Sequence, residues 1–459
     1  MNIYLHIEVS TRELDSKLLL GVIAASKGHE VLISDISEID RGIRFGILNP
    51  GIFHTKSLTP SRNKISFHKK LIDKGFLITS LDEEAGLELE SYKKFSDARY
   101  SKKTMDQSTA VFCWGNDDFK TLKKLYPKYK KKVIKTGSPR VDLWKSNFFD
   151  YWQLPNKKPK KPFLLVSSNM GASNGIKPIP DVVKFYREAG YFQRVPELFN
   201  EIFEEVAESS MKTSDFVEAI KYLVNNNKNN YDIVFRPHPV EDINAWKEYL
   251  KGIPNLHIIR EGSITAWVNN AFAVMHNGCT TAFETSVMGK PLLTYLPFKR
   301  KYKKNISNQL GYKIHSLKSL SKKLDSLLKN YKLKKKTVNN KTITKLISKK
   351  IYLDKNAFAS DKIVKVWEII NKKKSNLTTN WTNLFFLLKT IKVKNMFVDV
   401  VNKIFTGNLK SKKNWKFTPI DKNDINERVD KIKHVLNLKQ NIYCKIISER
   451  AILIKKSKT

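Results

Sequence analysis

The chain of 459 residues is 41% hydrophobic and carries a formal net charge of +40. This length exceeds one ordinary core and the composition excludes general disorder, so we expect two globular domains and an extension. Residues 301–459 hold 40 Lys/Arg against 10 Asp/Glu, so +30 of the charge lies in the C-terminal third. Such charge attracts nucleic acid, anionic membranes or acidic glycans without distinguishing them. Because no recognised nucleic-acid module accompanies the charge, we expect no specific nucleic-acid partner.

The three cysteines, Cys113, Cys279 and Cys444, are widely separated, which predicts neither a disulfide framework nor a zinc site. The apolar run at residues 1–7 is followed at once by charged residues and lacks the core of a signal peptide. No stretch approaches the ~20 apolar residues of a membrane span. We therefore expect a cytoplasmic protein, with peripheral contact to the inner face of the plasma membrane as an alternative.

The first elements in the chain predict a βαβ opening: a buried strand at 2–9, an amphipathic helix at 13–27 and a strand at 29–35. Further strand-like runs lie at 76–79, 110–114 and 133–136. A Pro/Lys linker at 155–162 precedes a second α/β series that starts at 163 and stops near Pro297.

The C-terminal third predicts helices. Residues 358–371 read as one helix of the kind that crosses back to the first lobe in two-lobed transferases. Residues 381–406 combine apolar and Lys residues, which fits either a helix lying on anionic lipid or a helix packed on the body of the protein. We slightly favour the second. The expected parts are two Rossmann-like domains, a helical closure and a basic helical extension, at residues 1–154, 162–310, 311–372 and 373–459.

Two segments of the second domain carry polar residues directly after a strand. The first is Arg236-Pro237-His238-Pro239, after the strand 231–235. In an open α/β sheet ligands bind beyond the carboxyl ends of strands, and the two prolines stiffen this turn. His238 can hydrogen-bond or protonate a phosphate oxygen there, and Arg236 adds positive charge. The alternative is a structural histidine in a rigid turn.

The second segment follows the strand 271–275 and opens a helix. Free amides at a helix N-terminus bind anions, a glycine allows close approach of the backbone, and a carboxylate one turn later can accept hydrogen bonds from ribose. The alternative is simple helix capping, which does not exclude binding. The candidate nucleotide-binding or phosphate-binding residues are His276, Asn277, Gly278, Thr280, Thr281 and Glu284, together with Arg236.

In the first domain, Asp82-Glu83-Glu84 follows the strand 76–79. One of these acids can serve as the base that deprotonates an acceptor hydroxyl, because its acidic neighbours raise its pKa. The alternative is an acidic surface turn. Asp15 and Arg12, where the first strand meets the first helix, are weaker candidates for contact with the acceptor.

Other chemistry has no signature here. The chain has no Asp-x-Asp, no Walker A sequence and no Gly-x-Gly-x-x-Gly. We therefore expect no metal and no cofactor. The pattern suits metal-independent inverting transfer, with a carboxylate base on one side and stabilisation of the leaving phosphate on the other.

At these residues the chain resembles bacterial surface-carbohydrate (capsule or lipopolysaccharide) biosynthesis proteins with a GT-B fold. That group includes capsule Kdo-transferase-like proteins, bacterial sialyltransferases and polysialyltransferases and, more distantly, CDP-glycerol glycerophosphotransferases. The resemblance covers residues 1–300. It rests on the order of three motifs: Glu83-Glu84-Ala85-Gly86, with an extra Ala before the Gly, then His238-Pro239, then Thr280-Thr281.

The resemblance implies two Rossmann-like domains facing a central cleft, with a helical basic C-terminal extension. It implies Glu83 or Glu84 as the base, His238 assisting the departing phosphate, and Thr280 and Thr281 holding that phosphate. The implied activity is glycosyl transfer of a Kdo-like or nonulosonic acid from a CMP donor to a glycan or lipid-linked glycan. The alternatives are transfer of a polyol phosphate from a CDP-alditol, and a non-catalytic glycan-binding or scaffold protein.

Overall fold

The computed structural model describes residues 1–89, 91–155, 158–226, 230–297, 305–334, 341–354, 356–371, 379–406 and 420–457. For residues 341–343 and 398–406 it describes the backbone alone. The chain forms two compact units. Unit 1 comprises Met1–Glu83, Tyr100–Leu143 and Tyr352–Thr459, and unit 2 comprises Glu84–Arg99 and Trp144–Ile351. Part of the expected linker, residues 156 and 157, lies outside the described residues.

Unit 1 is built on an eight-stranded sheet with the order β13-β14-β2-β1-β3-β4-β5-β6. The six strands from β2 to β6 run parallel, in the flavodoxin-like order 2-1-3-4-5-6. The strands are β1 Asn2–His6, β2 Glu30–Ser34, β3 Ile52–Thr55, β4 Leu77–Leu81, β5 Ala110–Cys113, β6 Val133–Lys135, β13 Ile442–Ser448 and β14 Ala451–Lys456. The sequence reading missed β3, β13 and β14.

Helices of unit 1 are α1 Ser10–Ser26, α2 Ile36–Arg44, α3 Arg62–Asp73, α5 Lys102–Gln107, α6 Asn116–Leu125, α7 Pro139–Asp142, α17 Ala359–Asn371, α18 Trp381–Thr406 and α19 Lys422–Val435. The return of the chain to unit 1 is fixed by Asp142, whose carboxylate accepts hydrogen bonds from the backbone N–H groups of Ala359 and Ser360 at 3.0 and 3.1 Å. These two amides open α17, so Asp142 caps that helix across more than 200 residues of sequence.

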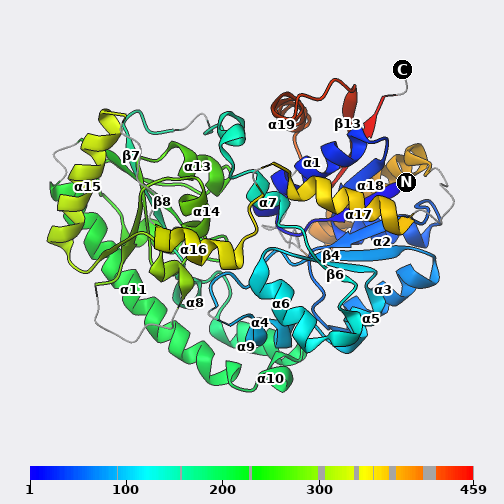
Figure 1. The fold of residues 1–459 in the computed structure, drawn as a ribbon, viewed down its shortest axis with the longest axis horizontal. Coiled ribbons are helices and arrows are strands. Elements are labelled where there is room, and N and C mark those ends of the chain that lie inside the picture. The colour runs from blue at the N-terminus through cyan, green and yellow to red at the C-terminus, as the bar shows by residue number, and fades with distance from the viewer. Residues whose placement is uncertain are drawn as a thin grey trace. The chain divides into compact units, whose positions relative to one another are not determined.

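The C-terminal extension is only partly helical, which corrects the expectation of a helical tail. After α19 the chain forms the hairpin β13–β14, drawn in red in Figure 1. Strand β14 pairs antiparallel with β2, with Leu453 opposite Leu32. The buried run Ala451–Ile454 belongs to the core of unit 1 although its flanks are basic. The hairpin is therefore an integral edge of the first sheet.

Unit 2 is built on a six-stranded parallel sheet with the order β12-β11-β10-β7-β8-β9. In chain order this is the 3-2-1-4-5-6 arrangement of Rossmann-type sheets. Its strands are β7 Phe163–Ser167, β8 Asp232–Arg236, β9 Leu256–Ile258, β10 Ala273–His276, β11 Leu292–Tyr295 and β12 Tyr312–Ile314. We expected the α/β alternation to stop near Pro297. It continues instead, because β12 forms the edge strand of this sheet and α15 follows it.

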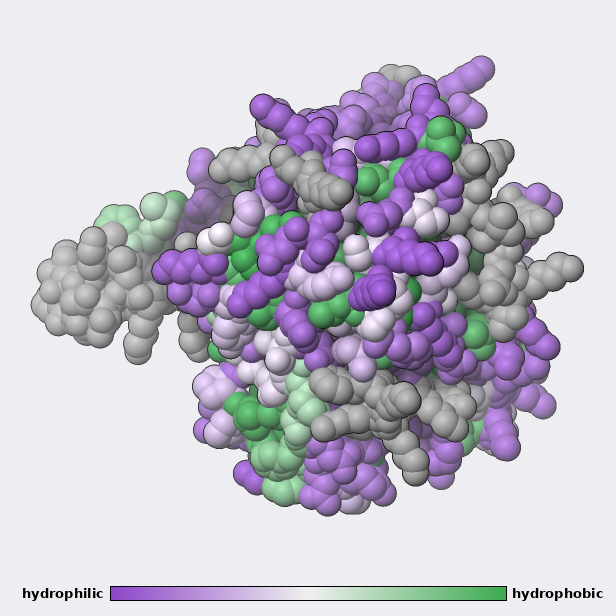
Figure 2. All heavy atoms as spheres, turned by 90° about the vertical axis from the view of Figure 1, so that its left-hand side faces the viewer, coloured by the Kyte–Doolittle hydropathy of each residue, from purple (hydrophilic) through white to green (hydrophobic). Residues whose placement is uncertain are grey.

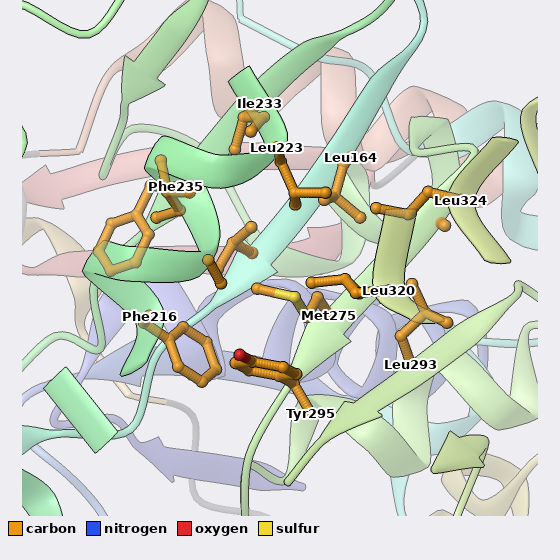
Figure 3. Packing of buried hydrophobic residues seen from close by; sticks show 14 of the residues in the cluster. Leu164, Phe216, Leu223, Ile233, Phe235, Met275, Leu293, Tyr295, Leu320 and Leu324 are labelled. Atoms are coloured by element: carbon orange, nitrogen blue, oxygen red, sulfur yellow. The ribbon is translucent and has the colours of Figure 1, made fainter. Parts of the chain in front are cut away.

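Unit 2 contains the helices α4 Tyr92–Arg99, α8 Gly171–Asn174, α9 Ile179–Glu188, α10 Tyr191–Arg194, α11 Leu198–Asn226, α12 Ile243–Tyr249, α13 Ile264–Asn270, α14 Thr281–Val287, α15 Leu317–Lys332 and α16 Lys341–Lys350. Helices α11 and α15 pack on the sheet through buried apolar residues. Figure 3 shows Met275 of β10 at the centre of this core, with Phe216 of α11 and Leu320 and Leu324 of α15 around it. The rings of Phe216 and Tyr295 meet edge to face at 6.0 Å.

The predicted α/β architecture of two Rossmann-like domains is confirmed. A GT-B fold consists of two such domains. The division of the chain differs from the expected boundaries, because residues 84–99 and 144–154 belong to unit 2. Long-range hydrogen bonds explain this. Ile306 donates its backbone N–H to the carbonyl of Glu88 at 3.1 Å, and Lys350 donates to the carbonyl of Leu89 at 2.7 Å. The periodicity of the sequence does not predict such long-range contacts.

The face drawn in Figure 2 is mostly hydrophilic, and its hydrophobic residues form small separate patches. No helix in the described part of the chain combines the length and hydropathy that a membrane span requires. Helix α18 is packed at its start, where Trp381, Leu384 and Leu388 join the core of unit 1. Further along, Met396 and Phe397 are 59% and 70% exposed. The side chains of residues 398–406, which belong to the same expected helix, lie outside the described residues.

Candidate ligand site of unit 2

Polar residues gather at the carboxyl ends of three adjacent strands of unit 2. Strand β7 lies between β10 and β8, and the strand order reverses between β7 and β10. Open α/β sheets bind ligands at such a switch point. The residues at these strand ends are 167–171 at β7, 237–241 at β8 and 277–281 at β10. The structure thus brings the two predicted motif loops to the same edge of one sheet, on either side of the loop after β7.

The His238 loop is fixed by Ser168 and Glu241. Ser168 accepts a hydrogen bond from the backbone N–H of His238 at 3.2 Å and donates its hydroxyl to Glu241 at 2.8 Å. The Glu241 carboxylate also accepts from the backbone N–H of Met170 at 2.8 Å and from Trp246 Nε1 at 2.6 Å. Burial raises the pKa of Glu241, although these donors favour its charged form. Its role is to connect the loops after β7 and β8.

The ring of His238 is only half-buried. Its Nδ1 accepts a hydrogen bond from the backbone N–H of Val240 at 3.4 Å. A neutral ring held in this way carries its hydrogen on Nε2. His238 can therefore present an N–H donor to an oxygen of a ligand, as the sequence predicts.

The loop after β10 is tied to the loop after β7 in the same manner. Ser167 donates its hydroxyl to Thr281 Oγ1 at 3.2 Å, and Asn169 donates its side-chain N–H to the carbonyl of Gly278 at 2.5 Å. Gly278 has φ +73, a left-handed conformation that favours glycine. Segment 167–169, which the sequence reading did not single out, is therefore the bridge between the two predicted motifs.

Asn277 is the residue in this loop whose environment points most directly to a ligand. Its side chain is 1% exposed, and neither its Oδ1 nor its Nδ2 has a hydrogen-bond partner among the described residues. A buried amide without partners is costly, and native structures rarely leave one unsatisfied. This observation supports the prediction that Asn277 binds a polar group.

Arg236 occupies a different position from the predicted one. Its guanidinium donates to the backbone carbonyls of Glu261, Arg260 and Gly262 at 2.6, 3.1 and 2.8 Å. Burial lowers its pKa to about 9. The side chain therefore supports the loop after β9, and its expected contact with a phosphate stays a prediction. A sequence pattern cannot distinguish these uses, because both place an arginine at the end of a strand.

His276 and Glu284 are also part of the frame. His276 is fully buried, its Nε2 bonds Thr294 Oγ1 at 2.9 Å, and burial lowers its pKa to about 3, so the ring is neutral. Glu284 is fully buried and accepts a hydrogen bond from the Thr265 hydroxyl. Both side chains support the loop through these contacts, and the direct nucleotide contact that we expected from both stays a prediction.

The expected helix N-terminus is weaker than predicted. Helix α14 has seven residues, and the side chain of Thr280 at its N-cap makes no capping hydrogen bond. Thr280 is exposed, whereas Thr281 is buried and accepts from both Ser167 and the Cys279 thiol. Of the two threonines, only Thr280 presents its hydroxyl to the surface. The polar character of the site therefore comes from its loops.

The acidic segment of the first domain divides at the boundary between the units. Glu83 is buried in unit 1, where its Oε1 forms an ion pair with Lys17 Nζ at 2.6 Å. Its Oε2 is buried without a partner among the described residues. Glu84 begins the first segment of unit 2 and is exposed. The three acids therefore do not form the single repelling cluster that we expected.

Asp15 and Arg12 are engaged within unit 1. Asp15 forms an ion pair with Arg428 of α19 at 2.7 Å, which attaches the C-terminal extension to α1. Arg12 pairs with the buried Glu13 at 3.0 Å. These contacts give both residues a structural role in unit 1, and their contact with an acceptor stays a prediction.

Three residues near the Gly278 loop carry polar groups that the sequence reading missed. Asn308 accepts from the backbone N–H of Gly278 at 2.7 Å, and its Nδ2 is buried without a partner among the described residues. Lys212 of α11 lies beside the same glycine. Glu88 accepts from the Ser307 hydroxyl, its Oε1 is buried without such a partner, and burial raises its pKa to about 7. All three come from distant parts of the sequence.

Comparisons with known proteins do not assign the chain to a family. No protein-family model and no curated protein sequence matches the chain. Similar solved structures include UDP-N-acetylglucosamine 2-epimerase from Methanocaldococcus jannaschii, at 12% identity and TM-score 0.47, over 80% of this chain and 100% of that chain. The enzyme of that name from Neisseria meningitidis gives 12% and 0.42, over 82% and 100%. The wall teichoic acid polymerase TagF gives 11% and 0.40, over 73% and 85%. At these scores the likenesses carry no argument, and the fold assignment rests on the sheets themselves.

Among the described residues, no group of three or more His, Cys, Asp or Glu side chains is arranged to hold a metal ion.

The buried carboxyl of Glu88 makes stability depend on pH. Its folded-state pKa of about 7 lies above the ordinary value of 4.5. The stability that Glu88 contributes is complete below about pH 4.5 and is lost as the pH rises through 7, a loss on the order of 3 kcal/mol. In Glu88→Gln this loss disappears. We expect the free energy of unfolding of the variant, relative to the unsubstituted protein, to increase between pH 5 and pH 8 in urea titrations.

The control for this prediction is Glu204→Gln, which removes an exposed carboxyl from α11. A Glu88→Gln difference that is equal at the two pH values, like that of the control, would show that Glu88 ionises normally in the folded protein.

Proposed function

We propose that this chain is a metal-independent, inverting glycosyltransferase of surface polysaccharide biosynthesis, in capsule or lipopolysaccharide assembly. Its donor would be a CMP-linked, Kdo-like or nonulosonic acid sugar, and its acceptor a glycan or lipid-linked glycan. The observation that carries the proposal is the placement of the His238 and Asn277 loops on either side of the loop after β7, at the carboxyl edge of the second sheet. The order of the acidic, His-Pro and Thr-Thr motifs supports the choice of donor.

In the proposed reaction, His238 donates from Nε2 to an oxygen of the donor phosphate. The acceptor hydroxyl loses its proton to a carboxylate, and its oxygen forms a bond to the anomeric carbon. The bond between that carbon and the phosphate oxygen breaks, and its electron pair leaves with CMP, so the configuration inverts. We assign the base to Glu84, because it is exposed whereas Glu83 is buried.

A thermal-shift screen with CMP, CDP, UDP and GDP tests the donor class. A ligand at 100 times its Kd stabilises the folded state by about 2.7 kcal/mol, which raises the melting temperature by several degrees. We expect cytidine nucleotides to produce this shift and UDP and GDP to produce little. Equal shifts from all four nucleotides, or none from any, would contradict the assignment.

Mass analysis of the product then separates the transferred groups, because a glycosyltransferase and a CDP-alditol-dependent transferase both release CMP. The mass gained by the acceptor identifies either a sugar or a polyol phosphate. No gain with any cytidine-linked donor would favour a non-catalytic glycan-binding protein.

His238→Ala tests the role of the imidazole. Loss of a general acid or of a donor to the leaving group lowers turnover by about 10²- to 10⁴-fold. We expect that loss in kcat, while the affinity for CMP changes by no more than a few-fold, because Asn277 and the backbone remain. The matched control is His257→Ala, at a half-exposed histidine of β9 that pairs with Asp232 at 3.3 Å. If both variants turn over at the same rate, His238 has no part in the reaction.

We propose in addition that the exposed part of α18 contacts an anionic membrane surface. Phe386, Met396 and Phe397 are exposed there, and Lys389, Lys392 and Lys394 lie between them in the helix. Removal of the whole extension is an unsuitable test, because β14 is part of the first sheet.

The point variant Met396→Glu/Phe397→Glu leaves that sheet intact. Burial of a Phe or Met side chain contributes about 1.5–3 kcal/mol, so we expect at least about ten-fold weaker co-sedimentation with vesicles that contain phosphatidylglycerol. Phe185→Glu, in exposed α9, is the control. Unchanged sedimentation of the double variant would refute lipid contact through α18, and equal binding to neutral vesicles would refute the electrostatic part.

A further inference from the structure

Three nitrogen donors converge on Gly278 from two other segments of unit 2. A Cβ atom built on this glycine would lie 3.1 Å from Asn305 Nδ2, 3.7 Å from Lys212 Nζ and 3.8 Å from Asn308 Nδ2. Because the glycine has no side chain, an ammonium and two amide NH₂ groups lie close to the place that a Cβ atom would occupy. These nitrogen atoms donate hydrogen bonds and accept none.

The orientation of Asn308 is fixed by the backbone. Its Oδ1 accepts from the N–H of Gly278 at 2.7 Å, so its Nδ2 must point elsewhere. That Nδ2 is buried and has no hydrogen-bond partner among the described residues, while the residue as a whole is 8% exposed. A buried donor beside a lysine that has no partner among the described residues indicates a place for an acceptor from a ligand.

Lys212 supplies the positive charge. It extends from the long helix α11, is 9% exposed, and pairs with Glu208 one turn earlier at 2.6 Å. An ammonium has three N–H donors, so one pair leaves two for another acceptor. The positive charges of Lys212 and of Lys350 on α16 act on Glu88 and lower its pKa, against the larger effect of burial, which raises it. Burial favours its neutral form, so Glu88 opposes a bound anion less than an ordinary carboxylate would.

We propose that Lys212, Asn305 and Asn308 form an oxyanion site in front of Gly278, built for a phosphate-like group. The inference deepens the proposed function, on which it rests for the identity of the ligand: the site would hold a phosphate oxygen of the nucleotide donor. Helix α14 is not needed for this site, because the donors are side chains of α11 and of the segment 305–308. Charge-assisted hydrogen bonds from Lys212 and the amide donors would provide the binding energy.

The test uses sulfate as the probe, compared with chloride at equal ionic strength, and then CMP compared with cytidine. The informative variant is Asn308→Asp, because the carboxylate keeps an acceptor for the N–H of Gly278 and replaces the free donor with a negative oxygen. We expect sulfate to raise the melting temperature of the unsubstituted protein and its Kd to rise about ten- to hundred-fold in the variant. Asn226→Asp, at the exposed end of α11, is the matched control and should bind as the unsubstituted protein does.

A second variant covers the case in which Asn308→Asp does not fold. Lys212→Met keeps the length of the side chain and removes the charge, and we expect the same loss of sulfate affinity, with partial recovery in Lys212→Arg. The proposal is overturned if sulfate stabilises no more than chloride, or if both folded variants retain full affinity.

Comparison of the probes separates this proposal from the assigned function. Binding of sulfate without binding of CMP supports the oxyanion site and contradicts a cytidine donor. Binding of CMP that is unaffected by Asn308→Asp and Lys212→Met contradicts the oxyanion site and leaves the donor assignment standing.

Discussion

The buried carboxylate of Glu241 is the contact on which the geometry of the unit 2 site depends. It holds the Ser168 hydroxyl, the amide of Met170 and the Trp246 indole at once, and Ser168 in turn holds the backbone N–H of His238. One carboxylate thus sets the distance between the loops that follow β7 and β8. Removal of a partner from such a network leaves a buried charge unsatisfied, which is why we regard these loops as rigid before any ligand binds.

The sequence predicted the features that depend on residues close together in the chain. The strands that end at Arg236 and His276 were predicted to within two residues, because a short apolar run followed by a rigid turn is a local signal. The placement of the His238 and Gly278 loops at one edge of the sheet followed from the rule for parallel sheets. What could not be predicted was which polar residues face a ligand. Arg236 is occupied by three carbonyl groups that lie 24 to 26 residues away.

The same limit explains the residues that were missed. Glu88 meets Ser307 across 219 residues, and the Lys212 ammonium reaches Gly278 from the middle of a long helix, so no spacing rule connects them. The C-terminal hairpin was missed for a different reason. Its apolar run Ala451–Ile454 is four residues long and lies among lysines, so composition suggested a solvated basic tail. The run is buried beside β2 although charged residues flank it, and composition alone does not predict this burial.

The central claim is that the edge of the second sheet between β10 and β8 is where a cytidine nucleotide binds. Hydrogen–deuterium exchange with and without CMP measures this directly, because a bound ligand slows the opening of the loops it touches. The account predicts slower exchange in residues 167–171, 237–241 and 277–281, with the hairpin at 442–456 unchanged as an internal reference. Protection confined to unit 1, or no protection in those three loops at saturating CMP, would contradict it.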